Sequence, residues 1–357
     1  MKDITRRDFL NGTQVAIGAS LLSPWAEVFG ADLSKFALGP DYYPPAKTGL
    51  RGSHDGSWET MHARVAGATW PVSDPEDSYD LVVVGGGISG LSAAHFYRKA
   101  RPGARILILD NHDDFGGHAK RNEFTVGGRT RIGYGGTESI DTPSAYSEIS
   151  RDLLVEIGID VQRFYRYFDQ ELYDGMDLSY AIAYDAETYG RRKLVPGYGS
   201  LPWQEFAAAT PMSDEAKADL VRAFTEERDY LPGMSREEKI AFLSKLSYRD
   251  YLKDYVRVDE QVLEMYQRWG MSYWCVGMDE VPAIAILGYT DGGGLPGLAH
   301  TVERVGYRGS EPYIFHFPDG NASVARLLVR KLIPDAVPGS TMEDVVTARV
   351  RYQYLDQ

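Results

Sequence analysis

The sequence predicts an α/β fold in which a parallel sheet forms close to residue 80 and a mainly helical region follows. Three observations predict it. The β-branched run at 81–84 is typical of a strand buried on both faces. A glycine-rich turn comes next, then helical spacing over 88–100 and a second apolar run at 105–110. From about 143 to 275 the apolar residues recur mostly at helical intervals.

Length and composition narrow the class of protein. At 357 residues the chain can hold two domains, or one large domain with insertions. The net charge of −13 argues against binding to nucleic acid or to an anionic membrane, and it would suit a cationic substrate. With a single cysteine, Cys275, no internal disulfide, iron–sulfur, c-type haem or usual zinc site is expected. Its aromatic neighbours predict a buried structural thiol.

The N-terminus resembles a twin-arginine export signal. Arg6 and Arg7 are followed by Phe and Leu and by a weakly apolar stretch at 15–22, which is too short to span a membrane. We therefore expect a signal peptide over 1–31, recognition by the twin-arginine translocase, a periplasmic location and no transmembrane segment. A basic tail with an amphipathic helix is the alternative reading of this segment.

Four further regions are expected after the signal. Residues 32–79, rich in Pro, Gly, Asp and aromatics, predict an extended arm over a later domain. An 80–142 domain and a mainly helical 143–320 region follow, and 321–357 predicts a helix and a first strand returning towards the 80–142 domain. Helices are expected at 144–157, 213–230, 235–245, 247–256, 259–269 and 321–333, and a hairpin at 178–195.

The turn after the first strand carries the most informative motif. Gly85, Gly87 and Gly90 fit the pattern GxGxxG between a strand and a helix, and Asp110 closes the second strand. Gly85 permits the tight turn, Gly87 lets a pyrophosphate approach, and Gly90 with Ala94 lets the helix pack closely on the sheet. The N-terminus of the helix attracts phosphate, and the carboxylate of Asp110 can accept hydrogen bonds from the ribose hydroxyl groups. This predicts a Rossmann-like dinucleotide-binding unit, without separating FAD from NAD.

Two later glycine pairs favour FAD. Gly116-Gly117 and Gly135-Gly136-Thr137 follow Asp110 in an order that resembles the flavin-containing amine oxidoreductase superfamily. That resemblance implies that the first pair approaches the FAD pyrophosphate and that the second runs beside the flavin. The cofactor-binding residues expected from the motif and the resemblance are Gly85, Gly87, Ser89, Gly90, Asp110, Gly116, Gly117, His118, Gly135, Gly136 and Thr137.

One residue departs from the superfamily pattern. His118 stands where an arginine is usual, and a neutral imidazole donates only one hydrogen bond. We expect Lys120 or Arg121 to supply the positive charge instead.

Three stretches, at 42–58, 116–124 and 317–328, resemble bacterial periplasmic spermidine dehydrogenases, over nearly the whole chain. The resemblance implies an FAD-dependent enzyme that takes hydride from a C–N bond of an amine and passes electrons to a carrier other than NAD. In that family haem accompanies FAD; without a CxxCH motif a haem would be non-covalent, with His54 and His62 as candidate axial ligands, and a surface or hydrogen-bonded histidine is the alternative reading of each. Residues available to pair with a polyamine through charge or cation–π contact are Glu138, Asp141, Tyr173 and Asp177.

The superfamily completes both its domains with later chain, so the sequence to Gln357 looks like the front part of a longer enzyme. We therefore expect weak FAD binding and no spermidine oxidation from these residues alone. Two alternatives remain open: another flavin oxidoreductase of the same fold, such as a desaturase or amino-acid oxidase, and a truncated inactive remnant.

Overall fold

The chain folds into two compact units, of which each is described by itself. The computed structural model describes residues 42–47, 58–71, 74, 77–289, 295–302, 311 and 315–355. Unit 1 contains the chain up to Ser139, then Leu154–Ile159 and the chain from His316; unit 2 contains Ile140–Leu153 and Asp160–Phe315. The expected signal over 1–31 and the candidate ligand His54 lie outside the described residues.

Unit 1 is built on the strand–helix–strand arrangement that the sequence predicts. Strands β1 (Leu81–Val84) and β2 (Ile106–Leu109) pair in parallel, with Leu81 opposite Ile106. Helix α3 (Ile88–Ala100) connects them and buries Ala94 completely. A parallel pair joined by a helix is the α/β arrangement expected from the apolar runs.

The expectation that β1 is buried on both faces is wrong. Val83 is buried, but Val82 and Val84 are 48% and 86% exposed. The physical reason is that in the described residues β1 and β2 form a two-stranded sheet. The side chains of a strand alternate between two faces, so a sheet covered on one face exposes every second residue.

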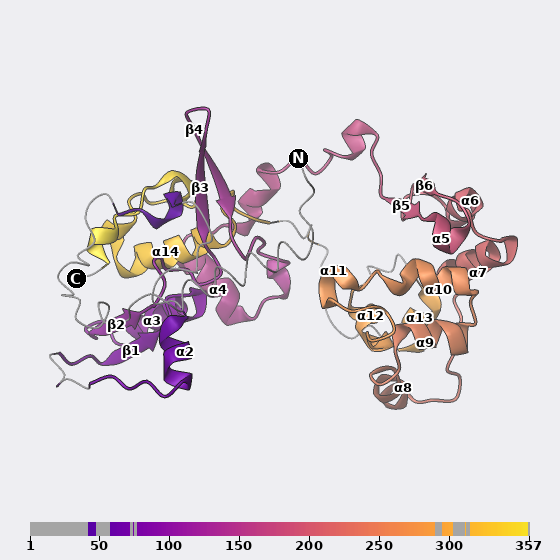
Figure 1. Ribbon diagram of the computed structural model, residues 1–357, viewed down its shortest axis with the longest axis horizontal. Helices are drawn as coiled ribbons and strands as arrows, with labels where there is room; N and C mark the ends of the chain where they lie inside the picture. Colours follow the sequence, from indigo (N-terminus) through magenta and orange to yellow (C-terminus); the bar gives the residue numbers. More distant parts are fainter. Residues whose placement is uncertain are drawn as a thin grey trace. The chain divides into compact units, whose positions relative to one another are not determined.

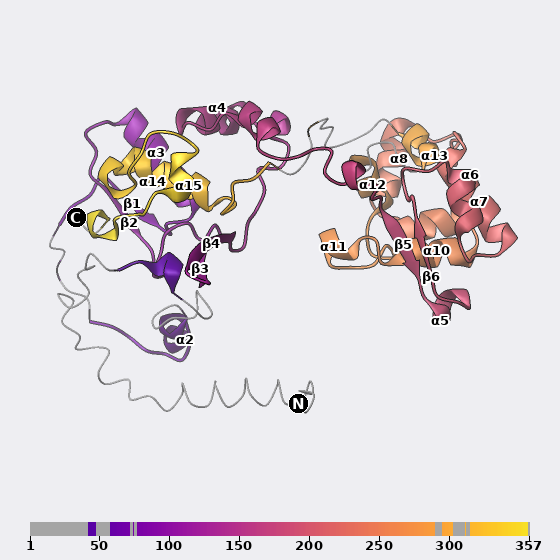
Figure 2. The same cartoon turned by 90° about the horizontal axis from the view of Figure 1, so that it is seen from above.

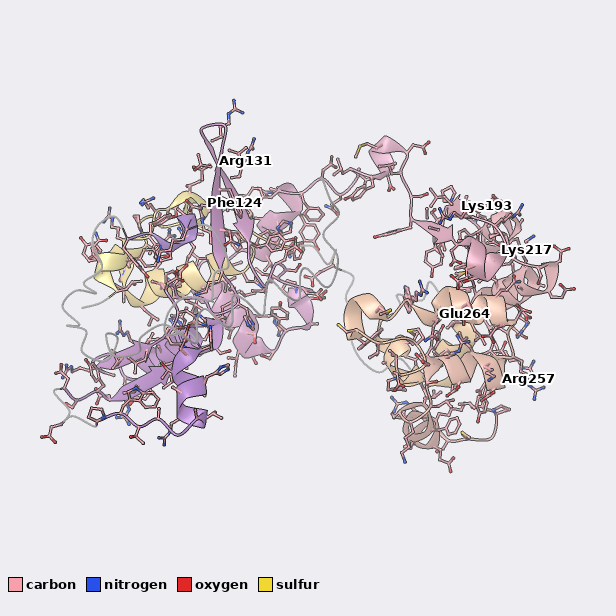
Figure 3. All side chains as sticks on the ribbon, viewed as in Figure 1. Phe124, Arg131, Lys193, Lys217, Arg257 and Glu264 are labelled. Atoms are coloured by element: carbon pink, nitrogen blue, oxygen red, sulfur yellow. The ribbon has the colours of Figure 1, made fainter. Side chains whose placement is uncertain are left out.

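A second pair of strands, absent from our sequence-based expectations, projects as a hairpin (Figure 1). Strands β3 (Arg121–Val126) and β4 (Arg129–Tyr134) are antiparallel and place Phe124 opposite Arg131, both labelled in Figure 3. The turn consists of Gly127 and Gly128, with φ of 57° and 73°. Positive φ at both central residues is typical of a type I′ hairpin turn.

The last part of unit 1 returns to α3. Helix α14 (Ala322–Leu332) lies beside α3 in both ribbon views (Figures 1 and 2), and Arg98 donates to the carbonyl of Leu332 at 2.8 Å. The strand expected after this helix does not form within 334–355. Short helices occupy that stretch instead: η8 (Pro334–Ala336), α15 (Asp344–Thr347) and η9 (Tyr352–Tyr354). The guanidinium groups of Arg326 and Arg330 donate hydrogen bonds to backbone carbonyl oxygens of this segment. These carbonyl groups therefore have partners without pairing to a neighbouring strand.

The described part of the N-terminal arm is not wholly extended. It contains a short turn, η3 (Pro44–Ala46), and a helix, α2 (Glu59–Val65). Tyr43 is buried and its hydroxyl donates to the carboxylate of Glu123 on β3 at 2.6 Å. Residues 42–47 of the arm are therefore packed against β3.

Unit 2 is mainly helical. It begins with the first two-thirds of α4 (Glu148–Glu156), whose last residues belong to unit 1. The α-helices that follow are α5 (Ala186–Tyr189), α6 (Trp203–Ala209), α7 (Asp214–Thr225), α8 (Arg236–Leu243), α9 (Tyr248–Asp250), α10 (Glu260–Gln267), α11 (Met271–Trp274), α12 (Ala283–Tyr289) and α13 (Pro296–Thr301). A π-helix, η7 (Tyr251–Val256), follows α9 directly. Ser213 and Ser235 cap α7 and α8 by accepting backbone N–H groups. Phe206, Leu220 and Tyr251 belong to its buried core.

Several sequence-based expectations for unit 2 change in detail. The expected helix at 247–256 begins as α9 and continues as a π-helix, η7. The expected hairpin forms between β5 (Ala181–Tyr184) and β6 (Lys193–Pro196), although α5 replaces a simple turn. Asp185 stabilises that insertion because its side chain accepts the N–H of Thr188 at 2.7 Å.

Cys275 is exposed, which corrects the expectation of a buried thiol. It ends α11 in the left-handed conformation, with φ of 59°. Among the described helices, none has both the length and the apolarity that crossing a membrane requires.

Candidate functional site

The turn between β1 and α3 is shaped by glycines that no other residue could replace without strain. Gly85 has φ of 106°, a region that residues with a Cβ rarely adopt. A Cβ on Gly90 would lie 2.0 Å from the carbonyl oxygen of Gly85 and 3.0 Å from Val83. Gly85 therefore makes the turn, and Gly90 allows α3 to pack against the strand that precedes it.

Gly87 differs from these two because the protein itself leaves room for a side chain there. A Cβ on Gly87 would meet nothing closer than 3.7 Å, the Cα of Gly117. Gly87 is the N-cap of α3, with no side chain capping the helix, and Ser89 lies exposed in its first turn. The N–H groups of that turn are thus available to an anion at the positive end of the helix dipole.

Asp110 lies at the end of β2 and contacts the same turn. Its Oδ2 accepts the N–H of Gly86 at 2.6 Å, and its Oδ1 accepts the N–H of His112 at 2.8 Å. These bonds fix the carboxylate while leaving each oxygen a lone pair for another donor. Gly86, which we did not select from the sequence, is buried and tied to Asp110; its position inside the motif was the available signal.

The first downstream glycine pair lies directly against this turn. The N–H of Gly116 donates to the carbonyl of Gly86 at 2.8 Å, and Gly87 and Gly116 form an isolated parallel bridge. Both glycines of the pair have positive φ, 102° at Gly116 and 60° at Gly117. A Cβ on Gly117 would lie 3.2 Å from the Cα of Gly87, so the two backbones face each other without side chains.

The second downstream pair lies beside the first. The N–H of Gly136 donates to the carbonyl of His118 at 2.9 Å, and the N–H of Gly135 to that of Lys120 at 2.8 Å. The start of α14 completes this side, because Asn321 donates through its side chain to the hydroxyl of Thr137 at 2.8 Å. Asn321 was not among the expected site residues, although it belongs to one of the stretches that carried the resemblance.

The charges beside these loops correct one expectation. Arg121 is buried and pairs with Glu123 at 2.8 Å and with Asp319 at 3.2 Å. Its guanidinium therefore neutralises carboxylates within unit 1 and does not serve a ligand. Lys120 donates to the carbonyl of Asp114, just before Gly116, so it lies next to the loop. His118 is exposed.

The remaining candidates are divided between the two units. Glu138 directly follows Thr137 in unit 1, whereas Asp141, Tyr173 and Asp177 belong to unit 2 and are exposed. His62 is also exposed, with its ring edge-on to Trp58. The described residues contain no group of three His, Cys, Asp or Glu side chains that could hold a metal ion.

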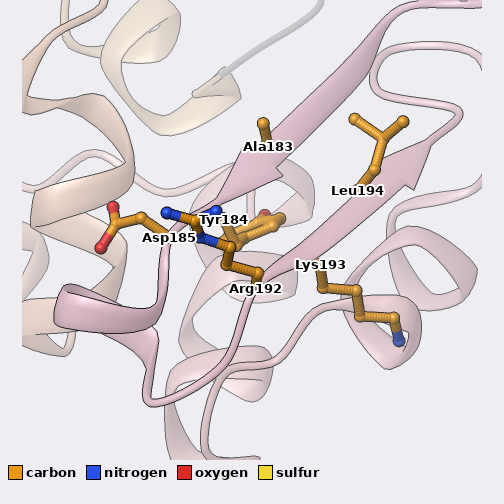
Figure 4. A pocket seen from close by; sticks show the side chains of 6 residues that line it. All are labelled: Ala183, Tyr184, Asp185, Arg192, Lys193 and Leu194. Atoms are coloured by element: carbon orange, nitrogen blue, oxygen red, sulfur yellow. The ribbon is translucent and has the colours of Figure 1, made fainter.

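A hollow of about 430 Å³ lies on the β5–β6 hairpin of unit 2. Figure 4 shows Arg192 beside Tyr184 and Asp185, while Lys193 points away from them. The hollow is open to solvent, and no glycine is among the residues that line it.

The glycine loops together provide side-chain-free backbone for a long ligand. Successive contacts run from Asp110 through the Gly87–Gly117 approach to Gly136 and Thr137. A family model described as an NAD(P)-binding Rossmann-like domain matches residues 83–156. This part of the chain is a Rossmann-like domain. The matched residues contain the glycine turn, α3 and every glycine of the candidate site, whereas the contact of Thr137 with Asn321 reaches the start of α14 outside them.

Comparisons beyond the Rossmann-like domain are weaker. Wild-type putrescine oxidase bound to putrescine is 17% identical, with a TM-score of 0.36, over 71% of this chain and 49% of that chain. A double mutant of that enzyme gives the same values, and a single mutant gives 18% identity and a TM-score of 0.25 over 52% and 35%. The chain thus spans about half the length of the putrescine oxidase it matches. A comparison with curated proteins finds no significant match.

Proposed function

We propose that this chain binds FAD along its three glycine segments and acts as an FAD-dependent oxidoreductase. The observation that carries the proposal is the approach of Gly87 to Gly117. At Gly87 a Cβ would meet no protein atom closer than 3.7 Å, so the protein itself does not require glycine there. A ligand that comes close to the backbone does require it, and a pyrophosphate at a helix N-terminus is such a ligand.

Each part of FAD would contact a different group of the protein. The N–H groups of the first turn of α3 would hold the pyrophosphate, and the backbone of Gly116 and Gly117 packs directly beside that turn. The fixed carboxylate of Asp110 would accept the adenosine ribose hydroxyls. The backbone at Gly135–Thr137 would run beside the flavin, which the superfamily resemblance places there. When bound, the flavin supplies the capacity to accept a hydride, and the protein binds and orients it.

The substrate class we propose is an amine, with a polyamine such as spermidine favoured. The support is the resemblance of residues 42–58, 116–124 and 317–328 to spermidine dehydrogenases and the net charge of −13, which attracts polycations. Electrons would then pass to a carrier and not to NAD.

The proposed function is tested by ligand titration and a substrate panel on the full chain. FAD, NADH and ADP are titrated by calorimetry, and artificial-acceptor reduction is followed with spermidine, putrescine and amino acids. We expect residues 1–357 to bind FAD more tightly than NADH, though weakly, and we expect polyamines to reduce the acceptor faster than amino acids when the chain is extended past Gln357. Binding of NADH in preference to FAD contradicts the cofactor, and turnover of amino acids alone contradicts the substrate.

We also propose export through the twin-arginine pathway, supported by the Arg6-Arg7 pair and the apolar stretch at 15–22. Changing both arginines to lysine retains the charge, and we expect the precursor to accumulate in the cytoplasm. Fractionation followed by immunoblotting measures this. Unchanged accumulation in the periplasm contradicts the proposal.

A further inference from the structure

The loop that leads into Gly116 is held by residues from both ends of the chain. The hydroxyl of Tyr42, in the N-terminal arm, donates to the carbonyl oxygen of Asp113 at 2.8 Å. The hydroxyl of Tyr352, near the C-terminal end, donates to Oδ1 of Asp114 at 2.7 Å. Neither tyrosine contacts a glycine of the candidate site in these bonds, so any influence on a ligand passes through this loop.

Tyr352 is the centre of the contact. It is 3% exposed, and its ring lies 5.7 Å from that of Tyr42, 6.0 Å from that of Tyr43 and 6.2 Å from that of Phe115, centroid to centroid. Asp114 is itself 7% exposed. A buried carboxylate needs hydrogen-bond donors, and the Tyr352 hydroxyl is one of them.

Further charges strengthen the same contact. The guanidinium of Arg349 lies 3.8 Å over the ring of Tyr43, and the ammonium of Lys47 lies 4.7 Å over that of Tyr42. Lys47 also approaches the carboxylate of Asp113 at 3.5 Å. Residues 42–47 of the arm and residues 349–352 thus hold loop 113–115 in place through aromatic packing, cation–π contacts and hydrogen bonds.

The position of loop 113–117 sets how closely Gly116 and Gly117 approach Gly86 and Gly87. Asp113, Asp114 and Phe115 lead directly to Gly116, whose N–H must reach the carbonyl of Gly86, and to Gly117, which faces Gly87. Glycines at positive φ resist displacement only weakly, because they have many accessible conformations. The loop therefore needs anchors outside itself to keep the backbone groups aligned.

We propose that Tyr352 and Tyr42 are positioning residues of the nucleotide site, which hold loop 113–117 in the conformation that binds a pyrophosphate. This inference rests on the proposed function, since it requires a dinucleotide at the glycine loops. It assigns the N-terminal arm and the C-terminal segment, which lie outside the Rossmann-like domain, a role in ligand affinity.

The test compares Tyr352→Phe with a matched control, Tyr354→Phe, in the same turn of η9. ADP and adenosine are titrated by NMR, which reaches millimolar affinities, and thermal unfolding is followed without ligand. Loss of one hydrogen bond to a charged group predicts about tenfold weaker binding of ADP by Tyr352→Phe. Adenosine, which has no phosphate, should bind as in the wild type, and Tyr354→Phe should leave both affinities unchanged.

A second variant covers failure of Tyr352→Phe to fold. Tyr42→Phe removes the donor to Asp113 at a partly exposed position, and we expect a smaller loss of ADP affinity, about threefold, with adenosine unaffected. ADP binding that is unchanged in every folded variant contradicts the positioning role. Equal weakening of ADP and adenosine also contradicts it, because that result indicates a merely structural role. Absence of ADP binding by the wild type contradicts the proposed function itself.

Discussion

The two units depend on different kinds of packing. In unit 1 the critical contacts join backbone to backbone, as at Gly90, where a Cβ would lie 2.0 Å from the carbonyl of Gly85. In unit 2 large side chains fill a core, with Trp203 stacked on Phe224 at 3.8 Å and Phe206 fully buried. An added atom should therefore damage unit 1 most, whereas a removed atom should damage unit 2 most. Substitutions of opposite kinds can test this comparison.

The largest effect is expected from Gly90→Val. The new side chain collides with the Gly85 carbonyl and with Val83, so α3 cannot rest on β1. We expect amide hydrogen exchange to show lost protection over 81–109 and retained protection over 203–267. Gly103→Val is the matched control, because a Cβ there meets nothing within 4 Å. Uniform loss of protection in both units would contradict independent packing.

The next effect concerns unit 2. Phe206→Ala leaves a cavity in the aromatic core, and such a truncation costs about 3–5 kcal/mol of folding free energy. We expect hydrogen exchange to accelerate over 203–267 while the affinity of the chain for ADP stays within twofold of the wild type. A parallel loss of ADP binding would show that the nucleotide site depends on the helical unit.

A smaller effect is expected at Asp110. Asp110→Ala removes the acceptor for the Gly86 and His112 N–H groups and for a ribose hydroxyl. We expect adenosine and ADP to bind about tenfold more weakly, with similar factors for both, since the ribose is common to them. Calorimetry measures this, with the exposed Asp335→Ala as control. If ADP weakens and adenosine does not, Asp110 acts on the phosphates instead.

The smallest effect concerns alkaline pH. Burial raises the pKa of Tyr251 in unit 2 to about 12, and burial with the nearby Asp114 carboxylate raises the pKa of Tyr352 in unit 1. The folded state holds these protons more tightly than the unfolded state, whose tyrosine pKa is about 10. Their stabilisation is complete below pH 10 and is lost as pH rises through the folded-state pKa.

Urea unfolding between pH 9 and 11 measures this loss, which should be about 1 kcal/mol at pH 10.5. Tyr251→Phe should reduce the pH dependence of unit 2, where burial also raises the pKa of Tyr248 and Tyr266, and Tyr352→Phe should reduce that of unit 1. A fall in stability that is the same in both variants as in the wild type would show that other groups titrate.

The sequence predicted the part of the fold where local pattern and chain order suffice. The run at 81–84, the glycine turn and Asp110 specify β1, α3 and β2 because neighbouring residues decide them. The β3–β4 hairpin was missed although Gly127-Gly128 between alternating residues is a hairpin signal. The contacts of Tyr352 with Asp114 could not be foreseen, because 238 residues separate the partners.

The ion-pair partners of charged side chains also could not be predicted from the sequence. Arg121 follows the glycine pair and so looked suited to a phosphate, yet tertiary structure pairs it with Asp319, almost two hundred residues later. Exposure of Val82 and Val84 likewise depends on which elements cover the sheet, which a run of valines does not encode. Local motifs thus located the site, and long-range contacts decided which neighbouring groups serve it.

The central claim is that Gly87 is glycine for the sake of a ligand, whereas Gly90 is glycine for the sake of the fold. The most direct measurement is the affinity of Gly87→Ala for ADP and FAD, with unfolding temperature measured on the same samples. The account predicts an unfolding temperature close to that of the wild type and of Gly103→Ala, because the added Cβ meets no protein atom closer than 3.7 Å, with binding of both ligands abolished. Retention of FAD at the wild-type affinity in a folded Gly87→Ala variant would contradict it.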